Sequence, residues 1–425
     1  MPSFASLPGF RDFYPAEFSI RAHITNAWRV VARRYGFEEY DGPPLEPLEL
    51  YTEKSGEEIV RQLYNFEDKG GRGVALRPEM TPTFARMVGA RAAGLKKPIR
   101  WFSIPQLFRY ERTQRGRLRE HFQWNVDIVG EEDVGADAEV LAVAIDALRL
   151  LGLTEKDIVA RVNDRRLLEQ LLSHIGVAPD RMSAAYAVID KIGRDSETQT
   201  RDRLRSDVGL NQEGVARVLS IFQQESLESL AADFTGAADV DKELERLRSY
   251  FAQLSDLGLA EYVRFDPRIV RGLAYYTGIV FEIFDRQGEL RAVCGGGRYD
   301  NLLKNLGGVD LPALGFGMGD VVLAELLADR GLLAEYTVGL DYYIVAVTDA
   351  ERPAQKRLAR RLRDAGHSVS YSFKAGGVGK QFKDAHARGA KYVVVLGPDE
   401  VATGEAVVKD MASGTEKRMK IDELA

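Results

Sequence analysis

A long stretch without proline constrains the fold of this chain more than any other feature. No proline occurs between Pro179 and Pro267, and the stretch is rich in Leu, Ala, Arg, Asp and Glu. Its apolar residues recur at helical spacing, for example at Val215, Val218, Leu219 and Phe222. Proline breaks helix interiors, so its absence favours helices throughout. We therefore predict a helical insertion over residues 165–262.

Segments with the pattern of strands lie on both sides of this insertion. We expect strands at residues 99–104, 123–129, 279–284 and 291–294, and a hairpin from residues 63–66 and 74–76 around Gly70-Gly71-Arg72-Gly73. Helices are expected through Ile20, Ile24, Trp28, Val31 and Tyr35, through Phe84, Met87 and Val88, and over residues 136–151. Antiparallel strands mixed with helices indicate an α+β body, formed by residues 1–164 and 263–335.

The last 88 residues follow a different pattern. Strands and helices alternate as β-α-β-α-β over residues 342–347, 354–365, 369–373, 380–388 and 392–396, which predicts a separate α/β domain over residues 338–425. This part holds 15 Lys and Arg against 12 Asp and Glu, a net charge of +3. Because the whole chain has a net charge of −6, the remaining residues have a net charge of −9. A mildly basic domain on an acidic body is compatible with local nucleic-acid contact.

Composition excludes several classes of protein. Cys294 is the only cysteine, so an intrachain disulfide and cysteine-rich zinc sites are excluded. The five histidines are scattered without ligand spacing, so we expect no protein-held metal site. No apolar run approaches the roughly 20 residues that span a bilayer, and no signal peptide is visible, so we expect no membrane partner and a cytoplasmic location.

Two glycine-rich runs only partly resemble nucleotide-binding motifs. The run Gly376-Gly377-Val378-Gly379-Lys380 has Lys374 and Gln381 where a phosphate loop needs Gly and Ser or Thr. Gly315 to Gly319 is G-x-G-x-G, which differs from the dinucleotide fingerprint. Neither run predicts a nucleotide site by itself.

An arginine-rich segment offers a better candidate. Five arginines lie between Phe108 and Arg119, in a loop between two predicted strands. The planar guanidinium makes paired hydrogen bonds to phosphate, although a solvated basic loop remains the alternative. Two carboxylates, Glu79 and Asp127, flank the segment, and Arg271 precedes a glycine and a tyrosine pair.

With these residues, nearly the whole chain resembles histidyl-tRNA synthetase, a class II aminoacyl-tRNA synthetase. The first helix, the following strand and Pro43 resemble motif 1, and Phe108-Arg109-Tyr110-Glu111 with its arginine loop resembles motif 2. Gly315 to Gly319 occupies the place of motif 3. The segments Arg271-Gly272-Leu273-Ala274-Tyr275-Tyr276 and Gly296-Gly297-Arg298-Tyr299-Asp300 resemble the two histidyl signatures, and the tail resembles an anticodon-binding domain.

The resemblance implies a fold, a reaction and partners. The fold is a class II antiparallel sheet with helices, a helical insertion and a C-terminal α/β anticodon-binding domain. The reaction joins L-histidine to ATP, with Mg²⁺ at the phosphates, and then transfers the histidyl group to tRNA(His). A homodimer is expected through motif 1.

The resemblance also assigns roles to individual residues. Arg109 and Arg271 would hold the α-phosphate as catalytic residues. Histidine would be bound by Glu79, Thr81, Gln123, Asp127, Tyr275 and Tyr276. ATP would be bound by Arg109, Glu111, Arg117 and His121, and the tRNA acceptor end by Arg112 and Gln114.

Three positions depart from the family pattern. Val322 fills the place of the motif 3 arginine that contacts the γ-phosphate, Ala274 replaces an aspartate, and His121 replaces a phenylalanine that stacks on adenine. The missing arginine leaves one alternative open, a non-catalytic regulatory subunit of histidine biosynthesis that binds histidine as a signal. The motif 2 residues and the tRNA-type tail favour the synthetase.

Overall fold

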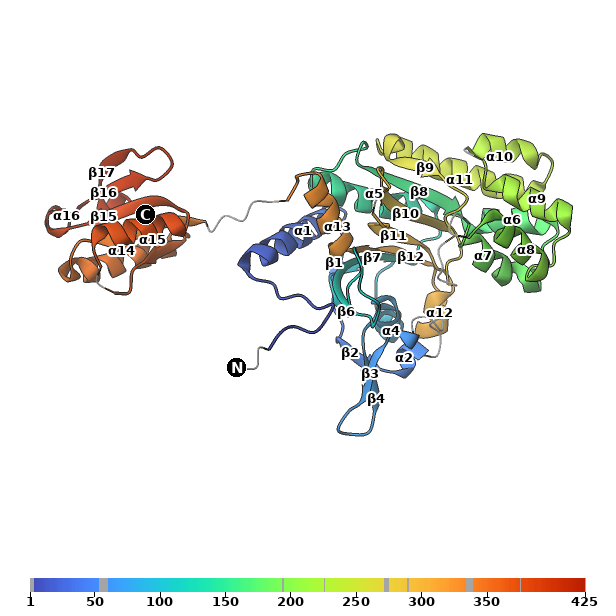
Figure 1. Ribbon diagram of the computed structural model, residues 1–425, viewed down its shortest axis with the longest axis horizontal. Coiled ribbons are helices and arrows are strands. Elements are labelled where there is room, and N and C mark those ends of the chain that lie inside the picture. Colours follow the sequence, from blue (N-terminus) through green and yellow to red (C-terminus); the bar gives the residue numbers. More distant parts are fainter. Residues whose placement is uncertain are drawn as a thin grey trace. The chain divides into compact units, whose positions relative to one another are not determined.

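The computed structural model describes residues 4–52, 60–192, 195–224, 226–270, 275–288, 290–333, 339–374 and 376–424. The chain divides into two compact units, Met1–Ala334 and Glu335–Ala425 (Figure 1). Most of the boundary expected near residues 335–339 falls outside the described residues. Each unit is described by itself below.

The first unit is built on a nine-stranded, mostly antiparallel sheet. The order of its strands is β1 (Glu38–Glu39), β5 (Ile99–Ser103), β7 (Glu120–Val129), β12 (Ala313–Gly319), β11 (Cys294–Arg298), β10 (Ile279–Asp285), β8 (Ile158–Asp164) and β9 (Val263–Phe265). The ninth strand, β6 (Gln106–Phe108), pairs with β7, and only the outer pairs β1–β5 and β8–β9 are parallel. The centre of this sheet therefore brings together strands from both ends of the unit.

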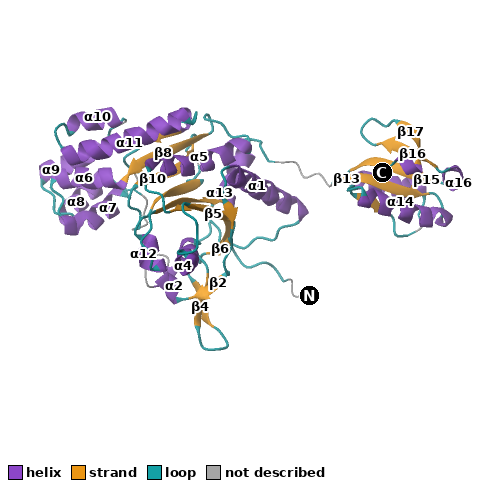
Figure 2. Ribbon diagram, turned by 180° about the vertical axis from the view of Figure 1, so that it is seen from behind, coloured by secondary structure: helices purple, strands orange, loops and turns teal. Residues whose placement is uncertain are grey.

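Helices pack on both faces of the sheet (Figure 2). One face carries α5 (Val134–Leu150), which also contacts α1 (Pro15–Arg34) and α11 (Ala238–Asp256). Because α5 is covered on several sides, it is apolar nearly all round, and Asp133 caps its first turn by accepting from the Gly135 N–H at 2.7 Å. The other face carries α4 (Thr81–Arg91) and α12 (Leu302–Gly307).

The predicted first helix is α1, and its apolar stripe explains its position. Trp28 of α1 is fully buried and stacks on Trp124 of β7, with ring centroids 5.9 Å apart. The helix ends at Arg34, and Gly36 just beyond it has a φ of 75°, which suits a residue without a Cβ atom. Helix α1 and strand β7, which follows the arginine loop, therefore share one hydrophobic core.

A hairpin projects from the sheet as predicted. It consists of β3 (Tyr64–Glu67) and β4 (Gly73–Leu76), joined in an antiparallel sheet with β2 (Leu45–Pro47), next to the short α2 (Glu49–Thr52). The segment after β4 carries Glu79 to the start of α4.

The predicted insertion over residues 165–262 is largely helical in its described residues. Its α-helices are α6 (Arg165–Ile175), α7 (Met182–Ile189), α8 (Glu197–Ser206), α9 (Gln212–Ile221), α10 (Leu227–Asp233) and α11. Several of them share a core of their own that includes Leu172, Leu204 and Val218. In Figure 1 this green part lies at one side of the sheet, and α6 contacts β8 and β10.

The second unit has the predicted α/β pattern with an additional hairpin. Its sheet has the order β14 (Val369–Tyr371), β13 (Leu340–Ala346), β15 (Ala390–Leu396), β16 (Glu405–Asp410) and β17 (Glu416–Lys420), and the first three strands are parallel. The helices are α14 (Arg352–Asp364), α15 (Val378–Ala387) and α16 (Pro398–Thr403). Alternate residues of β13 pack against α14 and α15, so these two helices cover opposite faces.

One predicted strand was misplaced. We expected a strand over residues 291–294, whereas β11 begins at Cys294 and continues through Gly295, Gly296 and Gly297. A Cβ atom on Gly297 would lie 2.5 Å from the Ile279 carbonyl oxygen, so the backbone can pack here only without side chains. Three glycines in a row resemble a turn in sequence, but here they form a central strand.

Candidate active site

Two cavities lie on the face of the main sheet that α5 leaves uncovered. Side chains along β7 point alternately to the two faces of the sheet, and Trp124, Val126 and Ile128 point into the hydrophobic core on the α5 side. The intervening side chains, Gln123, Asn125 and Asp127, line the smaller cavity.

Glycines of β12 form the floor beneath these side chains. Gly315 pairs with Asp127 and Gly317 pairs with Asn125. A Cβ atom on Gly317 would lie 2.6 Å from the Gln123 side-chain nitrogen, and one on Gly315 would overlap an Asp127 carboxylate oxygen. The glycine run therefore provides room for polar side chains of the neighbouring strand.

The smaller cavity brings together all six residues that the resemblance assigned to histidine. Its volume is about 290 Å³. The six residues come from the start of α4, from β7 and from the segment before β10: Glu79, Thr81, Gln123, Asp127, Tyr275 and Tyr276. Gln62, Asn125 and Tyr299 also line it. The cavity is thus small, polar and edged by aromatic rings.

Asp127 is a buried group of this cavity whose pKa is strongly shifted. It lies inside β7, within the strand predicted over residues 123–129, and it is 6% exposed. Burial raises its pKa to about 7, although the Tyr299 hydroxyl donates a hydrogen bond to the carboxylate and opposes the shift. A carboxyl group with a pKa near neutrality can accept a hydrogen bond from a ligand N–H once it is ionised.

Two further polar groups in this cavity are held in place. Burial raises the pKa of the Glu79 carboxyl, and the positive charge of Arg109 partly offsets that effect. Gln123 donates from Nε2 to Asn125 Oδ1 at 2.8 Å, which leaves its carbonyl oxygen as an acceptor. Glu79 and Gln123 together suit a ligand that carries an ammonium group.

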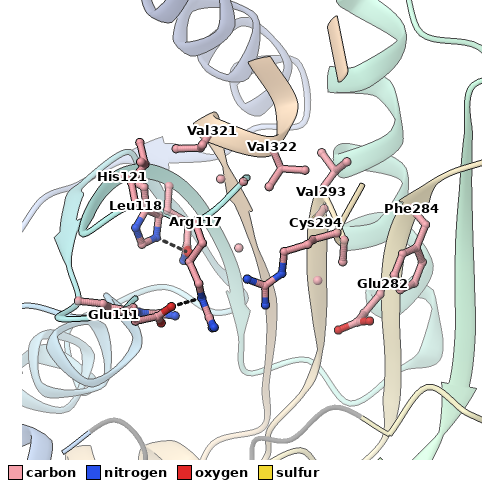
Figure 3. Close-up of a pocket in the computed structure, with 18 of the residues that line it drawn as sticks. Glu111, Arg117, Leu118, His121, Glu282, Phe284, Val293, Cys294, Val321 and Val322 are labelled. Atoms are coloured by element: carbon pink, nitrogen blue, oxygen red, sulfur yellow. Dashed lines mark hydrogen bonds and ion pairs between the residues drawn. The ribbon is translucent and has the colours of Figure 1, made fainter. Parts of the chain in front are cut away.

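The larger cavity adjoins the smaller one and is lined by basic groups. Its volume is about 710 Å³, and it shares Arg109, Glu111, Arg117 and Gln123 with the smaller cavity. Glu111 and Arg117 form an ion pair, and Arg109 donates to the Pro78 carbonyl oxygen at 2.8 Å. Figure 3 shows Glu111, Arg117 and His121 facing Cys294 and Glu282 across the cavity, with Val321 and Val322 above them. A ligand that fills both cavities would pass beside Arg109.

His121 lines the larger cavity as an uncharged ring. Burial lowers its pKa to about 3, and the nearby Arg109 acts in the same direction. Its Nε2 atom lies 3.4 Å from Gln123 Oε1. A neutral imidazole presents a flat face to a planar ligand without adding a charge.

The arginine loop between β6 and β7 is partly anchored. Arg115 contacts Glu325 and Asp329 of α13 (Asp320–Asp329), each at 3.1 Å. Arg112 and Gln114, assigned to the tRNA acceptor end, are exposed and lie outside both cavities. The loop is therefore neither wholly solvated nor wholly part of the site.

Some assigned residues are not described, and some lining residues were missed. Arg271 and Ala274 lie outside the described residues. Tyr299 stood in a quoted signature without a role, and the alternation along β7 would have identified Asn125. Arg268, which pairs with Asp266 at 2.8 and 2.9 Å, and Arg291 also line the larger cavity and were not singled out.

Comparisons with known proteins agree along the whole chain. A family model described as histidyl-tRNA synthetase matches residues 9–320, and one described as anticodon binding domain matches residues 341–425. A protein of Opitutus terrae named histidine–tRNA ligase is 46% identical over 98% of this chain and 96% of its own length. A chloroplastic/mitochondrial histidine–tRNA ligase of Arabidopsis thaliana is 40% identical over 98% of this chain and 85% of its own length.

The fold also has a solved counterpart. The crystal structure of histidyl-tRNA synthetase from Nostoc sp. PCC 7120 superposes with a TM-score of 0.85 at 24% identity, covering 100% of this chain and 98% of that one. In the part of the chain that the structure describes, no helix is long and apolar enough to cross a membrane.

Proposed function

The chain belongs to the histidyl-tRNA synthetase family, and from this premise we infer that its two joined cavities activate histidine with ATP and serve its transfer to tRNA(His). One observation carries the inference: a small polar cavity that suits histidine opens beside Arg109 into a larger basic cavity that suits ATP. The two ligands would meet where the first reaction must occur.

The smaller cavity would hold histidine in a reactive orientation. Glu79 and Gln123 would bind its ammonium group, with Thr81 beside them, and Asp127 and Tyr276 would meet the imidazole nitrogens, with Tyr275 nearby. A buried acceptor that pairs with a ring N–H rejects amino acids without that group, because its own polar atoms would stay unpaired. The Tyr299 hydroxyl supports this role because it fixes the Asp127 carboxylate.

The larger cavity would hold ATP and stabilise the charge that develops during attack. A histidine carboxylate oxygen forms a bond to the α-phosphorus, the bond from that phosphorus to the bridging oxygen breaks, and pyrophosphate leaves with the electron pair. Arg109 and Arg271 would face the equatorial oxygens, and Arg117, paired with Glu111, would face the outer phosphates. His121 would lie against adenine.

Magnesium would accompany ATP. In the described residues, no group of three or more His, Cys, Asp or Glu side chains is placed to hold a metal ion. Magnesium usually takes one or two protein carboxylates and several phosphate or water oxygens, and Glu111 and Glu282 face the larger cavity and fit that need. Bound there, the ion would neutralise charge on the phosphates.

The transfer step would use the exposed part of the motif 2 loop and the second unit. Arg112 and Gln114 would contact the acceptor end of tRNA, and the unit after residue 338 would bind the anticodon. We further propose a homodimer that works in the cytoplasm. The regulatory-subunit alternative is less well supported, because a histidine sensor needs no anticodon-binding domain.

The decisive test is histidine-dependent exchange of labelled pyrophosphate into ATP without tRNA. We expect exchange that requires histidine and stops when histidine is omitted. A protein that binds histidine but catalyses no exchange, with or without Mg²⁺, would instead be a sensor. Charging of tRNA(His) with labelled histidine then tests the second step.

A further inference from the structure

The larger cavity contains an arginine that has no part in the reaction proposed above. Arg291 lies three residues before β11 and lines the cavity beside Val293 and Cys294. Its side chain is exposed, and within the described residues it makes no hydrogen bond or ion pair. A guanidinium group that faces a cavity without a protein partner is available to an anionic ligand.

The other cations of this cavity are already engaged. Arg117 is paired with Glu111, and Arg268 makes two hydrogen bonds to Asp266 at 2.8 and 2.9 Å. Arg109 donates to a backbone carbonyl at 2.8 Å. Among the described cations that line the larger cavity, Arg291 therefore differs in having its full donor set unused.

Arg291 also lies next to the position where the family pattern is broken. A Cβ atom built on Gly116, at the turn of the arginine loop, would lie 3.2 Å from Val322 Cγ2 and 4.0 Å from Arg291 Cδ. Val322 belongs to the first turn of α13, whereas Arg291 belongs to the segment before β11. Two side chains from different elements thus converge on one point of the cavity, and the apolar one occupies the place expected for a cation.

We propose that Arg291 binds the β- and γ-phosphates of ATP and takes the role that Val322 cannot fill. This inference rests on the proposed function, because it assumes that the larger cavity binds ATP. When the bond between the α-phosphorus and the bridging oxygen breaks, negative charge grows on the departing pyrophosphate. A cation beside those phosphates stabilises both bound ATP and that charge.

The test compares Arg291→Ala and Arg291→Lys with the wild-type chain in histidine-dependent pyrophosphate exchange. We expect Arg291→Ala to raise the KM for ATP about 10- to 100-fold, the usual effect of losing a charge-assisted hydrogen bond. Lysine keeps the charge but loses the planar fork, so Arg291→Lys should recover part of the loss. Arg248→Ala, a half-exposed arginine of α11 outside both cavities, serves as the control and should behave as wild type.

Two further measurements separate outer-phosphate binding from a general effect. A non-hydrolysable sulfamoyl analogue of histidyl-adenylate lacks the outer phosphates, so its Kd should be unchanged in Arg291→Ala. The double variant Arg291→Ala/Val322→Arg places a cation at the neighbouring position 322 of the same cavity and should lower the KM for ATP relative to Arg291→Ala.

Unchanged KM for ATP in Arg291→Ala, or an equal loss of affinity for the analogue, would overturn the proposal. Absence of exchange in the wild-type chain would reject the proposed function instead. In that case, calorimetric ATP titration of the wild type and Arg291→Ala still decides whether Arg291 contacts ATP.

Discussion

At the scale of single residues, Asp127 has the clearest consequence for substrate choice. Its carboxylate lies in a buried position where Tyr299 donates to it, and it lines the small cavity. We expect Asp127→Ala to raise the KM for histidine about 10- to 100-fold, because a hydrogen bond to a charged group is lost. The KM for ATP should change far less. Steady-state exchange with each substrate varied in turn measures both constants, and equal changes would reject the assignment.

The raised pKa of Asp127 also predicts how stability depends on pH. In the folded chain the Asp127 carboxyl stays protonated up to about pH 7, whereas in the unfolded chain it loses its proton near pH 4. Between these values the unfolded state is favoured progressively, so this group lowers the free energy of unfolding as pH rises. Each unit of pKa difference corresponds to about 1.4 kcal/mol.

Asp127→Asn cannot ionise and should remove that contribution. Its melting temperature relative to wild type should therefore be higher at pH 8 than at pH 5. Differential scanning calorimetry of both proteins at the two pH values gives the comparison. A difference that is the same at both values would show that Asp127 does not titrate in this range.

At the scale of elements, the motif 2 loop divides into an anchored and an exposed part. Arg115 ties the loop to α13, whereas Gln114 faces solvent. We expect Gln114→Ala to slow transfer to tRNA about tenfold or less and to leave pyrophosphate exchange nearly unchanged, because a single neutral hydrogen bond is lost. Arg115→Ala is the informative comparison, since a loosened loop should reduce both activities. A loss of exchange in Gln114→Ala would contradict a role confined to tRNA.

Elements were predictable where a single periodicity dominates. The stripe of α1, the hairpin of β3 and β4 and the alternation in the second unit all follow from apolar spacing, and the structure confirms them. Strand β11 was misplaced because its glycines serve close packing between strands, which depends on neighbours distant in sequence. For the same reason, the meeting of Arg291 and Val322 could not be predicted from the sequence.

At the scale of the whole molecule, the two compact units predict separable functions. A chain that ends at residue 335 keeps every described residue that lines the two cavities. We expect it to retain pyrophosphate exchange within about twofold and to lose most tRNA charging, because the proposed anticodon contacts are removed. Both assays on the same preparation check this, and full-rate charging by the shortened chain would contradict it.

The exposed apolar residues near the N-terminus predict self-association. Leu7, Tyr14 and Phe18 are 67%, 69% and 48% exposed, although large apolar side chains are usually buried in the core or in an interface. If these residues form the proposed dimer interface, Phe18→Glu should shift the mass measured by light scattering from dimer to monomer. Leu257→Glu, at an equally exposed apolar position after α11, should leave the mass unchanged. A monomeric wild-type chain would reject the dimer itself.

The glycine floor under the smaller cavity limits how this enzyme can be redesigned. Protein engineers usually reshape a pocket by exchanging the side chains of its wall, but Gly315 and Gly317 offer no side chain to exchange and no room to add one. Alanine at either position would displace Asp127 or Gln123 before it touched any substrate. A library aimed at histidine analogues should therefore vary Thr81, Tyr275 and Tyr276 and leave both glycines fixed.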